Sequence, residues 1–168
     1  LTGINQPDYI QINDTLRLRK ALAIDYKIAV PWYQDWDVYH YSEGKTGDGD
    51  IPDEDYVKRM YDYLDKHGEN YFIEAFVGNS YIPIGDVTLK PQNPCIAIGV
   101  SEYREKGIGR AVMAAVLTRA KEIGIERLHD TMIYEDNLRS RRMFESLGFK
   151  RVRQEGNELY YELELKNE

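Results

Sequence analysis

A short segment that combines two glycines with three basic side chains has the clearest chemical potential in this sequence. Gly107 and Gly109 stand between an apolar run and a helical pattern, and Arg104, Lys106 and Arg110 surround them. Glycine lets the backbone approach a ligand without an intervening Cβ, and the first turn of a helix presents N–H groups that lack partners. The helix terminus adds about half a positive charge to the three full charges. The segment therefore predicts a site for a phosphate or pyrophosphate group.

Two common nucleotide motifs do not fit this segment. A P-loop needs the pattern G-x-x-x-x-G-K-[ST], and the dinucleotide fingerprint needs a third glycine where Val112 stands. Two glycines before a helix are also typical of a purely structural turn. On the residues alone, a phosphate site and a simple turn both stay open.

Two blocks of the sequence resemble the GNAT superfamily of N-acetyltransferases. The acetyl-CoA loop of that family reads Arg/Gln-x-x-Gly-x-Gly/Ala, and residues 104–109 here read Arg-Glu-Lys-Gly-Ile-Gly. Residues 137–149 are similar to the second family block, Asn-x-x-Ala/Ser-x-x-x-Tyr/Phe-x-x-x-Gly-Phe. The resemblance runs from about Tyr81 to Phe149 and implies a mixed, mostly antiparallel central sheet flanked by helices.

The resemblance also implies how acetyl-CoA would be held. Backbone N–H groups of the glycine loop would bind the pyrophosphate, and the strand before the loop would pair with the pantetheine arm as a pseudo-strand. Asn137 would either cap its own helix or bind the coenzyme, and Arg141 and Arg142 would approach the phosphates. The residues expected at the coenzyme are Ile98, Gly99, Val100, Arg104, Lys106, Gly107, Ile108, Gly109, Arg110, Ala111 and Asn137.

Acetyl transfer to an amine needs a neutral amine, stabilisation of the oxyanion and a proton for the leaving thiolate. The family's usual acid is a tyrosine in the second block, where this sequence has Phe144. Tyr134, at the end of a predicted strand, is the expected substitute, and Glu74 and Asp86 on central strands are the candidate bases. Direct transfer is expected, because no motif places a histidine or an acid to activate Cys95 as a nucleophile.

Apolar patterns and turn signals predict the elements that must position these residues. Strands are predicted at 16–19, 71–77, 81–89, 95–100, 127–133 and 158–165. Helices are predicted from about residue 25 to Pro31, and over 52–67, 108–123 and 137–147. The strand at 95–100 is apolar on both faces, as expected for a central strand between helices. This order of elements predicts an α/β or α+β fold.

Composition and charge narrow the class of protein. The 168 residues are 42% hydrophobic and fit a single domain, 1–168, and no apolar run is long enough to span a membrane. The first residues lack a signal-peptide pattern, so a cytoplasmic location is expected. One cysteine and three scattered histidines show no metal-ligand spacing, so no metal is expected. A net charge of −7 disfavours a nucleic-acid partner, whereas the acidic stretch 42–55 would attract a basic, polyamine-like substrate.

The sequence alone leaves two functions open. One is an acetyl-CoA-dependent N-acetyltransferase that acts on a primary amine of a small molecule or of a protein. The other is a CoA-binding regulatory module or pseudoenzyme, which the phenylalanine at 144 suggests. The resemblance favours the enzyme and also implies a homodimer. The acidic charge and the aromatic residues of the amino-terminal half favour a small amine as the acceptor.

Overall fold

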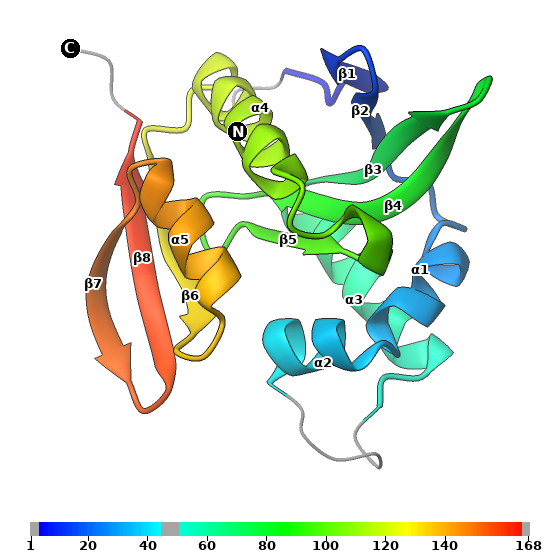
Figure 1. Ribbon diagram of the computed structural model, residues 1–168. Helices are drawn as coiled ribbons and strands as arrows, with labels where there is room; N and C mark the ends of the chain where they lie inside the picture. The colour runs from blue at the N-terminus through cyan, green and yellow to red at the C-terminus, as the bar shows by residue number, and fades with distance from the viewer. Residues whose placement is uncertain (1–3, 45–50, 166–168) are drawn as a thin grey trace.

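The computed structural model describes residues 4–44 and 51–165, which form two antiparallel sheets with helices on both sides (Figure 1). The first sheet has the strand order β1-β2-β3-β4-β5, and the second has the order β6-β8-β7. The strands are β1 (Tyr9–Asn13), β2 (Leu16–Lys20), β3 (Glu69–Val77), β4 (Ser80–Leu89), β5 (Cys95–Ile98), β6 (Arg127–Tyr134), β7 (Lys150–Glu155) and β8 (Glu158–Glu164). The helices are α1 (Tyr26–Tyr33), α2 (Trp36–Glu43), α3 (Glu54–His67), α4 (Ile108–Glu122) and α5 (Leu138–Ser146). The predicted architecture, a mostly antiparallel sheet flanked by helices, is confirmed.

Helices cover the first sheet on both faces, with α4 in front of the strands and α3 behind them in Figure 1. Val112 of α4 belongs to the larger core cluster, together with Tyr71 of β3. On the opposite face, Trp32 of α1 and Tyr61 of α3 pack around Phe72 of β3. Because successive strand residues point to opposite faces, the neighbours Tyr71 and Phe72 contribute to the two different clusters.

Strand β5 lies at the edge of the first sheet, so the prediction of a central strand is wrong. Its apolar composition has another cause, since α4 approaches one side of the strand and α2 approaches the other. A parallel bridge between Gln92 and His129 joins the approach to β5 with β6. Beyond this bridge β5 and β6 diverge, as Figure 1 shows.

Three elements were not predicted from the sequence, namely β1, α2 and β7. Helix α2 does carry recognisable end signals, because Asp35 accepts a hydrogen bond from the Asp37 N–H at 2.9 Å and Gly44 ends the helix in a left-handed conformation. Helix α1 also continues past its predicted end at Pro31. The burial of Trp32 and Tyr33 stabilises this last turn despite the proline.

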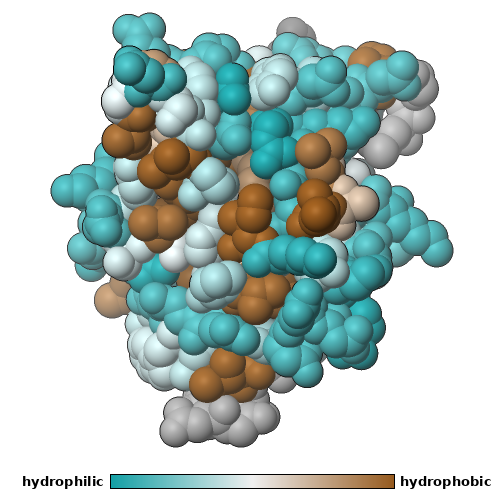
Figure 2. All heavy atoms as spheres, turned by 90° about the vertical axis from the view of Figure 1, so that its right-hand side faces the viewer, coloured by the Kyte–Doolittle hydropathy of each residue, from teal (hydrophilic) through white to brown (hydrophobic). Residues whose placement is uncertain are grey.

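The side of the molecule that carries the β3–β4 hairpin and α1 shows apolar groups separated by hydrophilic ones (Figure 2). Phe76, Val77, Ile82 and Ile28 are among the exposed apolar residues of these elements. Scattered apolar side chains are normal on protein surfaces. The apolar residues on this side therefore do not indicate a binding surface for a partner.

Gly99, just after β5, allows α1 to lie directly against the first sheet. A Cβ added at this position would collide with the indole ring of Trp32. The ring cannot move away freely, because it is buried and its centroid lies 5.2 Å from that of Phe72. Gly99 is thus required by packing.

We expect Gly99→Ala to lower the free energy of unfolding by about 1–3 kcal/mol, because the added methyl group overpacks the contact with Trp32. Gly109→Ala is the matched control, since a Cβ there meets only Met143 Cε, at 3.9 Å, and alanine favours a helix over glycine. Urea unfolding of both variants measures the difference. Equal stability of the two variants would contradict the packing argument.

Candidate active site

A cleft of about 520 Å³ lies between β5 and β6, where the two sheets diverge. Where the strands meet, the Asn93 N–H donates to the His129 carbonyl at 2.8 Å, and the His129 N–H donates to the Pro91 carbonyl at 2.9 Å. Residues of α2, of α5 and of the N-terminus of α4 form the rest of the wall. The glycine loop and the region around Asn137 therefore both line this cleft.

The N-terminus of α4 opens into this cleft. Gly107 is its N-cap residue, with a left-handed φ of +78° that favours glycine and with no side chain to cap the helix. Gly107, Ile108, Gly109 and Arg110 line the cleft, and a Cβ at Gly109 would meet only Met143 Cε, at 3.9 Å. Uncapped N–H groups at a helix N-terminus attract anions. The first turn of α4 thus fits a pyrophosphate.

Four of the expected coenzyme residues, Gly99, Val100, Lys106 and Ala111, are not part of the cleft wall. The N–H groups of Gly99 and Val100 both donate to the Ile84 carbonyl, at 2.7 and 3.1 Å. These two N–H groups are engaged within the first sheet, and their role toward a pantetheine arm stays a prediction. The engagement results from the chain direction after β5, which turns these peptide groups toward β4.

Ile98 is the expected pantetheine residue that does line the cleft. A Cβ added to Gly85 of β4 would collide with the Ala97 carbonyl, so this carbonyl faces β4. Peptide groups of a strand alternate in direction, and the N–H groups of Ile96 and Ile98 consequently point away from β4. The N–H groups of these two residues provide a backbone edge to which an amide-bearing ligand could add, whereas the Ile98 carbonyl already accepts a hydrogen bond from Arg104.

Arg104 is directed toward β5 and α2. Its Nε donates to the Ile98 carbonyl at 3.0 Å, and Nη2 donates to the Gly99 carbonyl at 3.3 Å. Its Nη1 lies 3.6 Å from a carboxylate oxygen of both Asp35 and Asp37. Arg104 lines the cleft and also links the end of β5 with the start of α2, and its role at the phosphates stays a prediction.

Asn137 lines the cleft and caps α5, because its Oδ1 accepts a hydrogen bond from the Ser140 N–H at 3.2 Å. Of the two arginines that follow, Arg142 lines the cleft. Arg141 instead donates through Nη1 to the Glu135 carbonyl at 2.8 Å. Arg142 and Arg110 are therefore the basic side chains beside the uncapped turn of α4.

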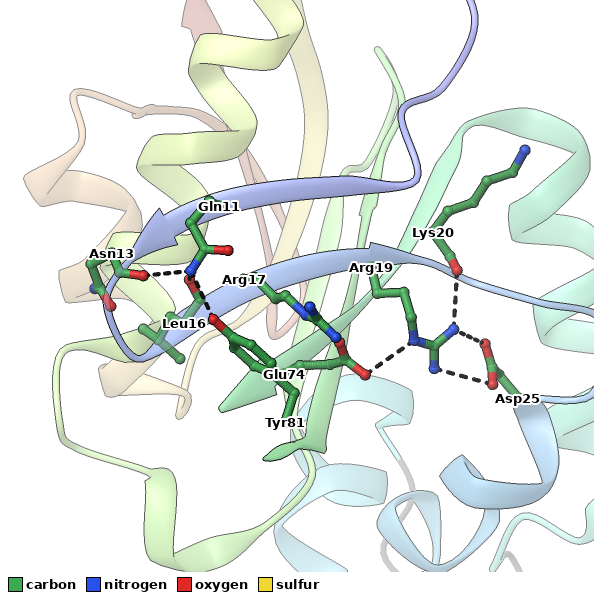
Figure 3. A network of polar contacts seen from close by, with 9 residues as sticks. All are labelled: Gln11, Asn13, Leu16, Arg17, Arg19, Lys20, Asp25, Glu74 and Tyr81. Carbon is green, nitrogen blue, oxygen red and sulfur yellow. Dashed lines mark hydrogen bonds and ion pairs between the residues drawn. The ribbon is translucent and has the colours of Figure 1, made fainter. Parts of the chain in front are cut away.

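Glu74, a predicted base, lies outside the cleft wall in a network between β2 and β3 (Figure 3). Its two carboxylate oxygens accept hydrogen bonds from Arg17 Nε at 2.8 Å and from Arg19 Nε at 3.1 Å. Arg19 also pairs with Asp25 at the start of α1, at 2.9 Å. Both acceptor oxygens are engaged by arginines, and Arg19 connects Glu74 to the start of α1, so the contacts give Glu74 a structural role and its role as a base stays a prediction.

Asp86, the other predicted base, is buried beneath α1 and α3 and does not line the cleft. Its carboxylate accepts hydrogen bonds from the hydroxyls of Tyr33, at 2.8 Å, and Tyr61, at 2.5 Å. Burial raises the pKa of Asp86 to about 6, although the two tyrosine hydrogen bonds act to lower it. Asp86 is a buried acid held by two phenols, and its role as a base stays a prediction.

Tyr134, the predicted acid, also lies outside the cleft wall. A side chain at Gly44, the residue that ends α2, would collide with its hydroxyl. Burial raises the pKa of Tyr134, and the nearby carboxylates Glu158 and Glu43 add to the rise. The position differs from the prediction because α2, which was not predicted, covers the hydroxyl.

Thr131 and Tyr41 line the cleft and were missed by the sequence analysis. Thr131 on β6 is 1% exposed, and its Oγ1 has no hydrogen-bond partner within the described residues. An unpaired buried hydroxyl is costly, which points to a ligand as the missing partner. The end signals of α2 would have identified Tyr41 as a helix residue, whereas no local signal marks Thr131.

Cys95 also lines the cleft, and burial raises the pKa of its thiol to about 11. No histidine is part of the wall as far as the structure describes it. A thiol with a raised pKa is a poor nucleophile. The geometry thus favours direct transfer over a covalent route through Cys95.

Within residues 4–44 and 51–165, no group of three or more His, Cys, Asp or Glu side chains is placed to hold a metal ion. In the same part of the chain, no helix has both the length and the apolar character for a membrane span.

We expect the ionisation of Asp86 to destabilise the fold. The folded-state pKa lies near 6 and the ordinary value is 3.8, so the folded protein keeps a proton that the unfolded chain loses. Stability should fall as the pH rises from about 4 to about 6, by about 3 kcal/mol relative to Asp86→Asn. Denaturant unfolding of both proteins across this pH range tests this, and parallel pH profiles would contradict it.

Comparison with known proteins places these features in a family. The model of the acetyltransferase (GNAT) family matches residues 29–149. The uncharacterized protein MJ1062 of Methanocaldococcus jannaschii is 39% identical over 93 residues, which cover 52% of this chain and 19% of that protein. The matched stretch thus spans about a fifth of this curated relative.

Solved structures share the fold across nearly the whole chain. A domain from Methanocaldococcus jannaschii DSM 2661 superposes with a TM-score of 0.77 at 24% identity, covering 90% of this chain and 99% of that domain. A GNAT-family acetyltransferase from Bacillus anthracis gives 0.72 at 19% identity, covering 94% and 98%. The microcin C7 self-immunity acetyltransferase MccE, in complex with acetyl-CoA and AMP, gives 0.67 at 13%, covering 95% and 97%. With the family model matching well over half of the residues, the chain belongs to the acetyltransferase (GNAT) family and is an acyltransferase.

Proposed function

We propose that the protein transfers the acetyl group of acetyl-CoA directly to a primary amine of a small molecule or protein, in the cleft between β5 and β6. The observation that carries this proposal is the uncapped N-terminus of α4, which opens into the cleft beside Gly107 and Gly109. In this proposal the whole chain acts as one domain, because β3 contributes side chains to both core clusters. The predicted homodimer stays a prediction.

The cleft residues have distinct parts in binding. The first-turn N–H groups of α4 would take the pyrophosphate, assisted by Arg110, whose Nε is bonded to Ser146 Oγ at 3.1 Å, and by Arg142. The backbone edges of Ile96 and Ile98 would bind the amides of the pantetheine arm. Acetyl-CoA, when bound, supplies the activated acetyl thioester.

Positioning is the main catalytic resource of this cleft. In the transfer the C–N bond forms as the thioester C–S bond breaks, and the proton lost by the amine nitrogen ends on the leaving sulfur. Holding both reactants in line contributes several kcal/mol in such reactions. Thr131 contributes to the wall a hydroxyl that has no partner within the described residues, Tyr41 contributes another, and Phe144 is buried against Phe149. Thr131 therefore replaces Tyr134 as the proposed polar contact of the bound thioester.

We expect wild-type protein to bind acetyl-CoA in a calorimetric titration and Gly109→Trp to lose this binding, because the indole would fill the space beside the first turn of α4. Val152→Trp, at an exposed position on β7, is the control for a new tryptophan that leaves the cleft intact. No binding by the wild type would overturn the proposal. Binding without acetylation of any amine in a broad panel would instead favour the CoA-binding regulatory module.

We expect Thr131→Val to have opposite effects on stability and on coenzyme affinity. Removing an unpaired buried hydroxyl should stabilise the free protein, by up to about 1 kcal/mol, because nothing within the described residues loses a hydrogen bond. Acetyl-CoA affinity should fall about fivefold to tenfold through the lost contact. Thr118→Val, whose hydroxyl bonds only its own helix, is the control. Unchanged affinity in Thr131→Val would remove Thr131 from the site.

A further inference from the structure

A second cavity, of about 640 Å³, adjoins the cleft. It lies among the C-terminal end of α3, the connection from β4 to β5, and the second sheet. Its wall includes Tyr63 and His67 of α3, Lys90 of the connection, and Arg153 and Tyr160 of the second sheet. Aromatic rings and basic groups thus face one space that the coenzyme site does not use.

Lys90 is the unusual group in this wall. The residue is 9% exposed, and no hydrogen bond or ion pair joins its ammonium to any of the described residues. Its Nζ lies 5.5 Å from the centroid of the Tyr63 ring, and its positive charge also acts to lower the pKa of the Cys95 thiol. An anion that enters the second cavity would therefore find in Lys90 a positive charge that no carboxylate of the described residues engages.

The other charges of this wall are already matched. Arg153 pairs with Asp130 at 3.0 Å and also with Glu155, and it stacks on the ring of Tyr160 at 3.7 Å. Asp130 accepts from His129 as well, at 2.9 Å. The ammonium of Lys90 therefore remains without a carboxylate partner among the described residues, beside the ring of Tyr63.

Asn93 and Met132 belong to the walls of both cavities. The Asn93 Oδ1 accepts a hydrogen bond from the Met132 N–H at 3.2 Å, which fixes these two residues against each other. A ligand held in the second cavity would thus have the cleft directly beyond Met132. This adjacency suits an acceptor whose amine enters the cleft while another part of the molecule stays behind.

We propose that the second cavity binds the acid group of the acceptor, so that the substrate is an amine that also carries a carboxylate or phosphate. The acid group pairs with Lys90, and a planar part of the acceptor lies against Tyr63 and Tyr160. This inference rests on the proposed acetyl transfer and replaces the expectation of a polyamine-like acceptor. That expectation came from the acidic stretch 42–55, of which residues 45–50 lie outside the described residues.

The four methionines give a direct test of the anion site. Met132 lines both cavities, Met143 lines only the cleft, and Met60 and Met113 line neither. In protein with methyl-labelled methionines, we expect benzoate to shift the NMR signal of Met132 and to leave that of Met143 in place. Benzamide, which has the same shape without the charge, should shift neither. No benzoate effect on Met132 would overturn the proposal.

Paired lysine variants show whether the ammonium of Lys90 is responsible. Lys90→Gln should weaken benzoate binding about tenfold or more, since a charge-assisted hydrogen bond is lost. Lys66→Gln makes the same charge change at an exposed position on α3 and should leave benzoate binding unchanged. Equal weakening in both variants, or none in Lys90→Gln, would contradict the assignment. Acetyl-CoA is expected to shift the NMR signal of Met143, which lines the cleft, and it should do so equally in both variants.

A matched pair of amines tests the acceptor class. We expect 4-(aminomethyl)benzoate to be acetylated with at least a tenfold higher kcat/KM than benzylamine, and Lys90→Gln to remove this preference. Benzoate binding without a preference for the acid-bearing amine would overturn the acceptor assignment. An absence of any acetyl-CoA effect on Met143 would instead overturn the proposed function, and the benzoate titration would still decide the anion site on its own.

Discussion

The cleft exists because β5 and β6 meet at a single parallel bridge and then separate. Asn93 and Asp130, each with a left-handed φ of 52°, stand on the two sides of this junction. Such backbone is costly for most residues, and Asn and Asp tolerate it best. Past the bridge, the facing edges of β5 and β6 have no partner strand in the part of the chain that the structure describes. Side chains bond some of their peptide groups, such as the Ile98 carbonyl and the Met132 N–H, and the other peptide groups of these edges need water or a ligand.

Charge pairs attach α2 to this divergent junction. Asp37 at the start of α2 contacts Arg139 of α5 at 2.5 Å, and it lies 3.6 Å from Arg104 of the glycine loop. Each pair is partly exposed and contributes little by itself. Together with the hydrogen bonds of Arg104 to β5, they connect three segments that surround the same cavity. The loop, α2 and α5 are therefore expected to respond together when an anion binds at α4.

The sequence was informative where a structural signal is local. Glycines 107 and 109, the cap at Asn137 and the helical spacing of α4 and α5 all lie within a few residues of the features they specify. The partners of Glu74 and Asp86 could not be predicted, because they come from distant elements. Strand register places Arg17 opposite Glu74, and the packing of α1 and α3 brings Tyr33 and Tyr61 to Asp86. No pattern within β3 or β4 contains that information.

Two hydroxyl residues of β6 show that local sequence was also insufficient to identify the groups that line the cleft. Thr131 was overlooked because a single threonine in a strand has no distinctive neighbours, and its importance depends on the absence of a partner in the folded protein. Tyr134, three residues later, was favoured because it stands at a strand end. The end of α2 then covers its hydroxyl. Which of two hydroxyl groups faces a cavity is decided by a helix nearly a hundred positions away in the chain.

Net charge and local charge lead to different expectations for the acceptor. The net charge of −7 acts through a long-range field, which physiological salt screens beyond about 8 Å. The Lys90 ammonium acts at contact, in surroundings where charges interact more strongly than in water. The long-range field influences how fast a charged ligand arrives, whereas the contact decides which ligand stays bound. An amine that also bears an acid group is compatible with both effects. Its total charge is near zero, so the negative long-range field does not repel it, and its acid group can reach Lys90.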